Sequence, residues 1–226
     1  HMADDLLTAY QSKISTYKEL LSQKNAQMEA HSKTEAEEYA KQLNIAMNYI
    51  TGEIKDNVNF NSEIQLFKLF RLISPQSHLI HPNKYRNELV QVGKYLCPEP
   101  ALVQSLVSQL FYQMKQIQNP LIRAIYFHHE LIRIHPFSDG NGRTTRMAKN
   151  WMLMYELYSP IFISGKKEKN EYVRTLESSF LELETNPGEW NEYLDLFFEQ
   201  ELSRLMNNTK SVFKSVNENG KNRFPN

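Results

Sequence analysis

The chain has a single cysteine, Cys97, which excludes an internal disulfide framework and a zinc cluster built on cysteines. A lone thiol of this kind is more typical of a small core residue than of a nucleophile. Long apolar runs and a signal-like start are also missing, so we expect no membrane partner. These absences favour a cytoplasmic location, with secretion as the alternative that they leave open.

The chain has no excess of charge of either sign, because 26 Lys and Arg side chains balance 26 Asp and Glu side chains. Proteins that bind nucleic acid through its phosphates usually carry a basic surface, and this balance argues against one. We therefore expect no nucleic-acid partner. Any ligand must be recognised by a small number of local residues.

Glycine and proline are scarce as well, with 7 and 9 in 226 residues, and long stretches contain neither. A sheet-rich fold needs such turn residues at short intervals, so the pattern favours an all-α or mainly α fold. We expect helices at one or two segments within 4–50 that end at Gly52, at 62–73 with an N-cap at Ser62 and a stop at Pro75, at 100–118, at 121–134, and from about Gly142 onward. A small β-hairpin is expected over 83–93.

The segment HPFSDGNGRTTR, residues 135–146, places one imidazole, one carboxylate, two glycines, one asparagine and two arginines within twelve positions. Pro136 disfavours a helical conformation at His135, so the preceding helix should end there. An apolar stripe at Met147, Trp151 and Met154 indicates that a buried helix begins after the glycines. The segment is therefore predicted to be a loop that joins two helices.

Residues in this loop have the properties of an anion site. Gly140 and Gly142 allow backbone conformations that other residues disfavour, and the first free N–H groups of the new helix point toward the loop. A helix start of this kind attracts phosphate. Arg143 and Arg146 are three positions apart, so they share one side of the first turns and are expected to reach the same polyanion.

Two further residues of the loop suggest chemistry beyond binding. Asp139 provides the oxygen ligand that Mg²⁺ prefers, and that ion is usually held by one or two carboxylates together with substrate phosphates. His135 has a suitable pKa to accept a proton near neutral pH. The residues alone thus predict a site for a magnesium nucleotide beside a general base. His128-His129-Glu130 does not have the HExxH spacing, so we interpret it as structural rather than zinc-binding.

The same segment resembles the core motif of the Fic domain family, HPFx(D/E)GNGRxxR, and matches every fixed position. Further similarities are Tyr85-Arg86, the Val90-x-Val92-Gly93 run, and Lys167 with Tyr172, and together they span roughly residues 60–205. The resemblance implies a Fic-type helical bundle with a small β-hairpin flap. It also implies three regions: an N-terminal helical extension (1–58), a catalytic domain (59–205) and a C-terminal polar tail or helix (206–226).

The resemblance implies transfer of AMP from ATP to a Ser, Thr or Tyr hydroxyl of a target protein, with release of pyrophosphate. In that reaction His135 would deprotonate the hydroxyl and Asp139 would hold Mg²⁺. The nucleotide would be bound by Gly140, Asn141 and Gly142 at the α-phosphate, by Arg143, by Arg146 at the γ-phosphate, and by Tyr172 at the adenine. Gly142, where phosphorylating members tend to have lysine, favours AMP transfer.

Other residues have supporting roles in the same reading. Phe137 would be a buried anchor that fixes the loop. The flap would hold the target by main-chain pairing, through Lys84, Tyr85, Arg86, Leu89, Val90 and Val92. Phe180 appears where many relatives place an asparagine in the adenine pocket. A long N-terminal helix could also form a homodimer contact.

The alternatives are a Fic-fold module that binds a nucleotide and a partner without turnover, and a Fic enzyme that transfers a different phosphate-containing group. The intact His135 favours an enzyme. Many family members also carry an inhibitory helix, (S/T)xxxE(G/N), whose glutamate pairs with the second motif arginine. The candidate glutamates here, Glu53 and Glu218, both depart from that pattern, and a separate inhibitor protein is the alternative.

Overall fold

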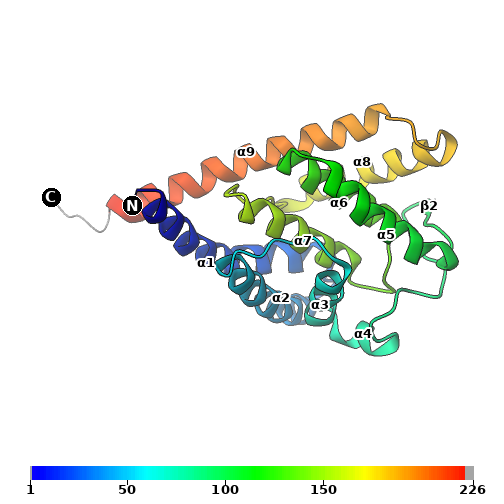
Figure 1. The fold of residues 1–226 in the computed structure, drawn as a ribbon, viewed down its shortest axis with the longest axis horizontal. Coiled ribbons are helices and arrows are strands. Elements are labelled where there is room, and N and C mark those ends of the chain that lie inside the picture. The colour runs from blue at the N-terminus through cyan, green and yellow to red at the C-terminus, as the bar shows by residue number, and fades with distance from the viewer. Residues whose placement is uncertain (1, 222–226) are drawn as a thin grey trace.

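The computed structural model describes the backbone of residues 2–221 and the side chains of residues 4, 8, 13, 14 and 16–210. This part of the chain folds into nine helices and one short hairpin, which confirms the predicted mainly α fold class (Figure 1). The elements are α1 (Met2–Glu29), α2 (Lys33–Lys55), α3 (Glu63–Ile73), α4 (Pro75–Ile80), β1 (Gln91–Val92), β2 (Tyr95–Leu96), α5 (Pro100–Gln116), α6 (Pro120–Ile134), α7 (Asn141–Tyr155), α8 (Gly165–Thr185) and α9 (Glu192–Lys221).

The N-terminal segment forms two helices that pack against each other, α1 and α2. Ser32 caps α2 by accepting a hydrogen bond from the backbone N–H of Glu35 at 3.1 Å. The prediction that Gly52 ends this helix was wrong, because α2 continues to Lys55. A glycine inside a helix costs only about 1 kcal/mol, and the flanking Ile50 and Ile54 are both buried in the core.

The predicted start of α3 is confirmed, since Ser62 and Gln65 form a complete capping box. The helix ends at Ile73, two residues before Pro75. Pro75 itself begins the short helix α4, which the sequence analysis did not predict. Proline suits the first turn of a helix, because its missing N–H would be unpaired there in any case.

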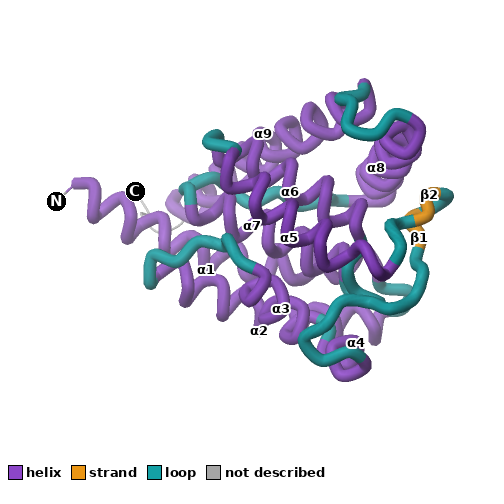
Figure 2. Tube along the Cα trace, turned by 45° about the vertical axis from the view of Figure 1, so that its right-hand side comes forward, coloured by secondary structure: helices purple, strands orange, loops and turns teal. Residues whose placement is uncertain are grey.

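The hairpin lies later in the chain than predicted. Its strands pair Gln91 with Leu96 and Val92 with Tyr95, and Gly93 in the turn has a φ of +57°. Residues 83–90 instead form an irregular segment. The apolar residues before Gly93 were taken for a whole strand, whereas the glycine that allows the tight turn lies between the strands. Figure 2 shows the hairpin at the edge of the molecule, near α8.

The helix α7 lies inside the bundle, with α1 and α2 on one side and α8 and α9 on the other (Figure 1). Trp151 of α7 is fully buried, and one core cluster extends from Ile14 of α1 to Leu205 of α9. Residues of the proposed N-terminal extension therefore pack into the same core as the loop motif. The proposed boundary at 205 falls within α9, which continues as one helix to Lys221. Within residues 2–221, no helix is both long and apolar enough to cross a membrane.

Candidate active site

The motif forms a loop between two helices, as predicted. Helix α6 ends at Ile134, and His135 follows in the left-handed region with φ +52° and ψ +62°. Gly140 is also left-handed, with φ +81°, and α7 begins at the next residue, Asn141. A left-handed conformation costs a non-glycine residue about 1–2 kcal/mol, so surrounding contacts must hold His135 in place.

Some of these contacts come from within the loop. The side chain of Asn141 accepts a hydrogen bond from the backbone N–H of Phe137 at 2.9 Å and donates one to its carbonyl oxygen at 2.7 Å. The Phe137 ring is buried and stacks on Phe70, with 3.8 Å between ring centroids. Phe137 is thus buried, as expected, and its stacking supports the predicted role as an anchor of the loop. Asn141 acts here as a brace for the loop.

Arg86 holds the loop from outside and is only 3% exposed. Its guanidinium donates to the carbonyl oxygens of Glu88 (2.9 Å), Pro98 (2.6 Å), Ile134 (3.1 Å) and His135 (2.6 Å). Every one of these acceptors is a main-chain group, and two of them lie at the end of α6. Arg86 therefore fixes the backbone at His135.

This result revises the predicted flap. Besides Arg86, the hydroxyl of Tyr85 is engaged, since it donates to Glu63 at 2.6 Å while its ring stacks on Phe67. These two side chains make contacts within the fold. The other predicted flap residues are accessible: Lys84 and Leu89 are exposed, the latter by 61%, and Val90 and Val92 are partly buried.

His135 is arranged to accept a proton. Its Nδ1 lies 3.1 Å from the carbonyl oxygen of Ile132, so Nδ1 carries the hydrogen and Nε2 keeps a free lone pair. Burial above all lowers the pKa of His135 to about 4, and the charge of Arg86 adds to this, against opposing effects of the Ile132 carbonyl and Asp139. The imidazole is therefore neutral near neutral pH.

A hollow of about 210 Å³ opens in front of this imidazole. Its walls bring together the predicted base, the predicted metal ligand and most of the predicted nucleotide residues, namely His135, Asp139, Gly140, Asn141, Gly142, Arg146 and Tyr172. The side chain of Asp139 is 67% exposed at this site. Within the described residues, no three His, Cys, Asp or Glu side chains form a group that could hold a metal ion.

Arg143 does not line the hollow, in contrast to the prediction that both arginines reach the same anion. Its guanidinium lies over the ring of Tyr39 in α2, 3.7 Å from the ring centroid, and 3.6 Å from a carboxylate oxygen of Asp139. The side chain is almost completely buried. The three-residue spacing places Arg143 and Arg146 on neighbouring turns, but Arg143 contacts Tyr39 of α2 instead of the hollow.

Arg146 is held by two residues of α1 that the sequence analysis missed. Its Nε donates to the side-chain oxygen of Asn25 at 2.8 Å, and its Nη2 donates to Glu29 at 2.5 Å. A Cβ added at Gly142 would lie 2.5 Å from the same Glu29 oxygen, so this carboxylate touches the start of α7. Glu29 therefore lines the hollow in contact with Arg146.

Glu29 was not one of the two glutamates considered from the sequence. Glu53 lies in α2 beside Tyr49, and the side chain of Glu218 is outside the described residues. A signal was present, because Asn25 and Glu29 have the four-residue spacing of the inhibitory pattern. Asparagine stands where serine or threonine was sought, and Ala30 stands where glycine or asparagine was sought.

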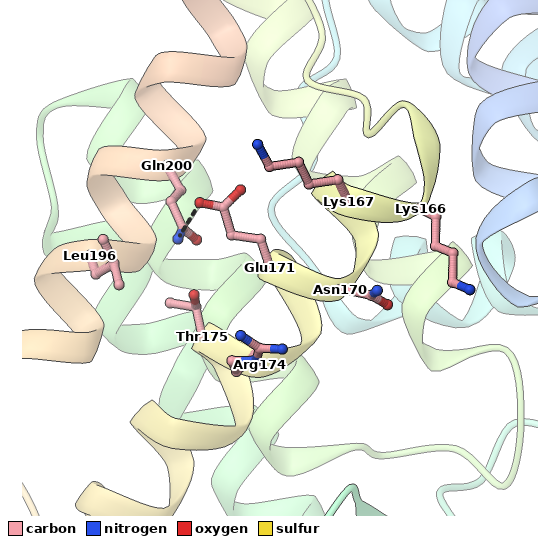
Figure 3. Close-up of a pocket in the computed structure, with 8 residues that line it drawn as sticks. All are labelled: Lys166, Lys167, Asn170, Glu171, Arg174, Thr175, Leu196 and Gln200. Carbon is pink, nitrogen blue, oxygen red and sulfur yellow. Dashed lines mark hydrogen bonds between the residues drawn. The ribbon is translucent and has the colours of Figure 1, made fainter.

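Tyr172 lines the hollow, but its hydroxyl is directed to a buried partner, Nε2 of His128, at 2.6 Å. Lys167 lies elsewhere, in a larger hollow of about 880 Å³ between α8 and α9 (Figure 3). Phe180 is in the core against Tyr95 and His129. Of these residues, only Tyr172 contributes to the motif site.

Cys97 is buried, as predicted for a core residue. Burial raises the pKa of its thiol to about 11, so the reactive thiolate is not formed near neutral pH. His129, the second histidine of the His128-His129 pair, interacts with Glu130 at 3.0 Å and Ser179 at 2.8 Å. Neither residue takes part in the motif hollow.

Comparisons with known proteins agree with this geometry. The model of the Fic/DOC family matches residues 16–153. A curated relative, protein adenylyltransferase Fic of Culex quinquefasciatus, is 30% identical over 139 residues, which cover 60% of this chain and 28% of that protein. This chain therefore spans only a little over a quarter of that relative's length.

Solved structures share the fold at low sequence identity. A Fic domain containing signaling protein from Bacteroides thetaiotaomicron aligns with a TM-score of 0.75 and 19% identity, over 95% of this chain and 96% of that one. IbpAFic2 covalently tethered to Cdc42 aligns with a TM-score of 0.57 and 14% identity, over 88% and 68% of the two chains. With the matched motif and the family model, these likenesses show that the chain belongs to the Fic/DOC family.

Proposed function

We propose that this protein transfers AMP from ATP to a Ser, Thr or Tyr hydroxyl of a target protein. The observation that carries the proposal is the free Nε2 of a neutral His135, which shares one hollow with the start of α7 and Arg146. The curated relatives named protein adenylyltransferase support the same chemistry. A module that only binds nucleotide would have no use for a positioned base.

In the proposed reaction the hydroxyl oxygen of the target bonds to the α-phosphorus of ATP, and Nε2 of His135 takes the hydroxyl proton. The bond from the α-phosphorus to the oxygen that bridges the β-phosphate breaks, and pyrophosphate leaves. Among the described residues, no side chain caps the start of α7, so its first N–H groups are available to the α-phosphate. Positioning and charge neutralisation provide most of the catalysis in such transfers.

Asp139 would hold Mg²⁺ in this site. Its carboxylate is largely exposed on the wall of the hollow, and the 3.6 Å separation from Arg143 is too long for a hydrogen bond. One carboxylate suffices for Mg²⁺ when substrate phosphates complete its coordination. The ion would neutralise charge on the departing pyrophosphate, while Arg146 would contact the γ-phosphate.

The contact between Glu29 and Arg146 supports an inhibited state for this conformation. The hollow of about 210 Å³ is smaller than the roughly 300–1,000 Å³ of most ligand pockets, and Glu29 is part of its wall. A γ-phosphate would compete with the Glu29 carboxylate for the same guanidinium. We therefore propose that α1 of this chain provides the inhibitory group, in place of a separate inhibitor protein.

The decisive experiment uses Mg²⁺ and ATP labelled on either the α- or the γ-phosphate, with a cell lysate and a Glu29→Ala variant. Label on protein from the α position alone, lost in the further variant His135→Ala, is expected. Label from the γ position would mean phosphorylation. Transfer that continued unchanged in His135→Ala would contradict the assignment of the base, and nucleotide binding without transfer would support the binding module.

A further inference from the structure

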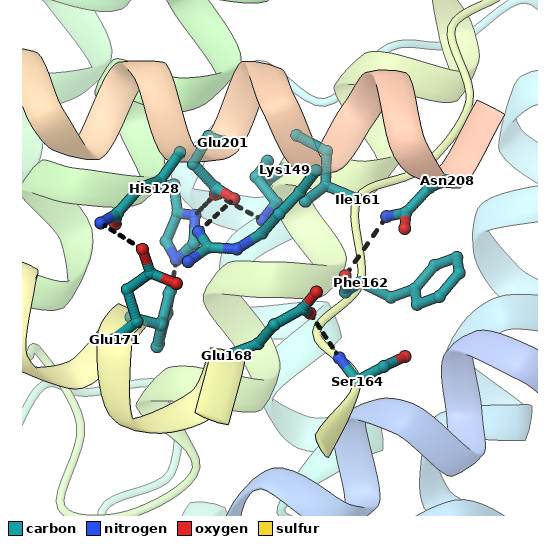
Figure 4. Close-up of polar contacts among 12 residues, drawn as sticks. His128, Lys149, Ile161, Phe162, Ser164, Glu168, Glu171, Glu201 and Asn208 are labelled. Carbon is teal, nitrogen blue, oxygen red and sulfur yellow. Dashed lines mark hydrogen bonds and ion pairs between the residues drawn. The ribbon is translucent and has the colours of Figure 1, made fainter. Parts of the chain in front are cut away.

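A buried charge cluster lies behind the motif hollow, outside the motif itself. Its centre is Glu201 of α9, which is 0% exposed. The carboxylate accepts hydrogen bonds from three helices: His128 of α6 at 2.8 Å, Lys149 of α7 at 2.9 Å and Arg204 of α9 at 3.2 Å (Figure 4). Removing so many charges from water is costly, and the attraction between them has to offset that cost.

The protonation of this cluster follows from its neighbours. Burial alone would raise the pKa of Glu201, but Lys149, His128 and Arg204 together hold it well below its ordinary value. An ionised carboxylate only accepts hydrogen bonds, so Nδ1 of His128 must carry its hydrogen. Burial first, and then the charge of Lys149, lower the pKa of His128 to about 3, so its Nε2 has a free lone pair.

The lone pair on His128 determines the direction of the next hydrogen bond. The hydroxyl of Tyr172 lies 2.6 Å from Nε2 and has to donate to it. The phenolic oxygen then has only lone pairs to offer to Arg146, which also lines the hollow and interacts with Tyr172. A guanidinium has donors alone, so the fixed hydroxyl presents it with an acceptor.

We propose that Glu201 and His128 are positioning residues, which lock the hydroxyl of Tyr172 as an acceptor and so keep Arg146 oriented toward the γ-phosphate after Glu29 withdraws. This inference rests on the proposed function. In the inhibited state Arg146 is held by Asn25 and Glu29 of α1. Once α1 releases Arg146, Tyr172 of α8 remains its neighbour. The Tyr172 oxygen, which His128 fixes as an acceptor, then keeps the guanidinium oriented.

His129 provides a matched control. It is as buried as His128, lies on the same helix and also bridges to α8, through Ser179 at 2.8 Å. Its ring packs against Phe180 and Phe197 rather than toward the hollow. Replacing either histidine by phenylalanine leaves one hydroxyl of α8 without its partner, so the two variants impose a similar structural cost. Only one of them breaks the connection to Arg146.

The test measures dissociation constants for magnesium ATP and for AMP by calorimetry, with Glu29→Ala as the parent protein. His128→Phe should weaken ATP binding about 10-fold, a typical effect of losing an acceptor for a charged group, while AMP binding changes by less than about 2-fold because AMP has no γ-phosphate. His129→Phe should leave both constants within about 2-fold. Combining His128→Phe with Tyr172→Phe should weaken ATP binding no further than Tyr172→Phe alone.

Equal losses of ATP affinity in the two histidine variants would overturn the proposal, as would fully additive losses in the double variant. If His128→Phe fails to fold, the ATP affinity of Tyr172→Phe becomes the test. An unchanged affinity in that variant would reject the proposal that Tyr172 positions Arg146. A Glu29→Ala parent that binds neither nucleotide would instead overturn the proposed function itself. The two failures are therefore distinguishable.

Discussion

The Glu29 carboxylate at the end of α1 lies 2.5 Å from the guanidinium of Arg146, near the start of α7. These residues are 117 positions apart in the chain, and the arginine is buried while the glutamate is one-third exposed. Although burial alone would lower the pKa of Arg146, Glu29 and Tyr172 together raise it. The pair thus neutralises a buried cation of α7 from the end of α1, a helix that packs into the same core.

Glu29→Ala should increase affinity for magnesium ATP by at least about 10-fold, because a competing charge-assisted hydrogen bond is removed. Transfer of AMP should increase with it. Calorimetry and transfer of an α-phosphate label measure the two effects. Glu53→Ala is the matched control, since it removes a helical glutamate beside Tyr49. An equal gain in that variant would mean that loss of negative charge, rather than release of Arg146, is responsible.

The pH dependence of transfer should show a base that stays active in acid. His135 has a pKa of about 4, so it is deprotonated above that value and becomes unavailable only below it. We expect kcat/KM of Glu29→Ala to stay level from about pH 7 to pH 5, since this ratio reports groups of the free enzyme. A decline centred near the ordinary histidine value of about 6.5 would show that the imidazole is solvated.

Acid should destabilise the fold, in part through His128. An unfolded histidine titrates near about 6.5, whereas the pKa in the folded protein is about 3. Between these values the unfolded chain binds a proton that the folded chain does not, so stability is present above the upper value and is lost as the pH falls. The loss from this group is about 1.4 kcal/mol per pH unit. Urea unfolding at several pH values measures it.

The comparison for that measurement is His128→Phe, which cannot bind the proton. Groups that do not interact with His128, including His135, contribute equally to both proteins. The variant should therefore show a shallower dependence of unfolding free energy on pH, whatever its stability at neutral pH. Parallel curves for the two proteins would mean that His128 titrates in the folded state much as it does in the unfolded chain.

Arg86→Gln should lower the free energy of unfolding by about 2–4 kcal/mol, because main-chain carbonyls that now receive a buried guanidinium would lose their donor. Transfer should fall as well, since two of these carbonyls belong to Ile134 and His135. Chemical denaturation gives the stability. Lys84→Gln changes an exposed cation of the same segment and should stay within about 0.5 kcal/mol of the parent.

Gly140→Ala and Gly165→Ala separate backbone strain from crowding. The two glycines have φ angles of +81° and +82°, but only at Gly140 would a Cβ meet another residue, Ser74, at 2.8 Å. Gly165→Ala should cost about 1–2 kcal/mol for the left-handed backbone. Gly140→Ala should cost at least about 1 kcal/mol more for overpacking. Equal costs would show that Ser74 moves aside freely.

Sequence patterns predicted the local features of the site well. The helix end at His135, the start of α7 and the burial of Phe137 each depend on neighbours within a few positions. The hairpin was misplaced because an apolar run before Gly93 resembles a strand, and the side chains of Tyr85 and Arg86 were assigned to a surface. Their burial depends on Glu63 and on the end of α6, which are distant in sequence.

Contacts between distant segments could not be predicted. Arg143 turns toward Tyr39 of α2, and Arg146 pairs with Glu29 of α1, although the motif alone presents both arginines alike. Glu201 shows no pattern in the sequence, because its partner His128 lies 73 residues away and no local rule favours a buried carboxylate. The electrostatics of the site is therefore a property of the tertiary fold.

The position of Glu201 in α9 also bears on how far this protein can be shortened. The family match ends at residue 153, whereas the carboxylate shared by His128 and Lys149 and the ring of Tyr172 come later in the chain. A fragment cut at the limit of sequence similarity would keep the whole motif yet expose the inner faces of α6 and α7 and lose the counter-ion between them. The smallest unit that unfolds cooperatively with an intact site must include α8 and the first part of α9.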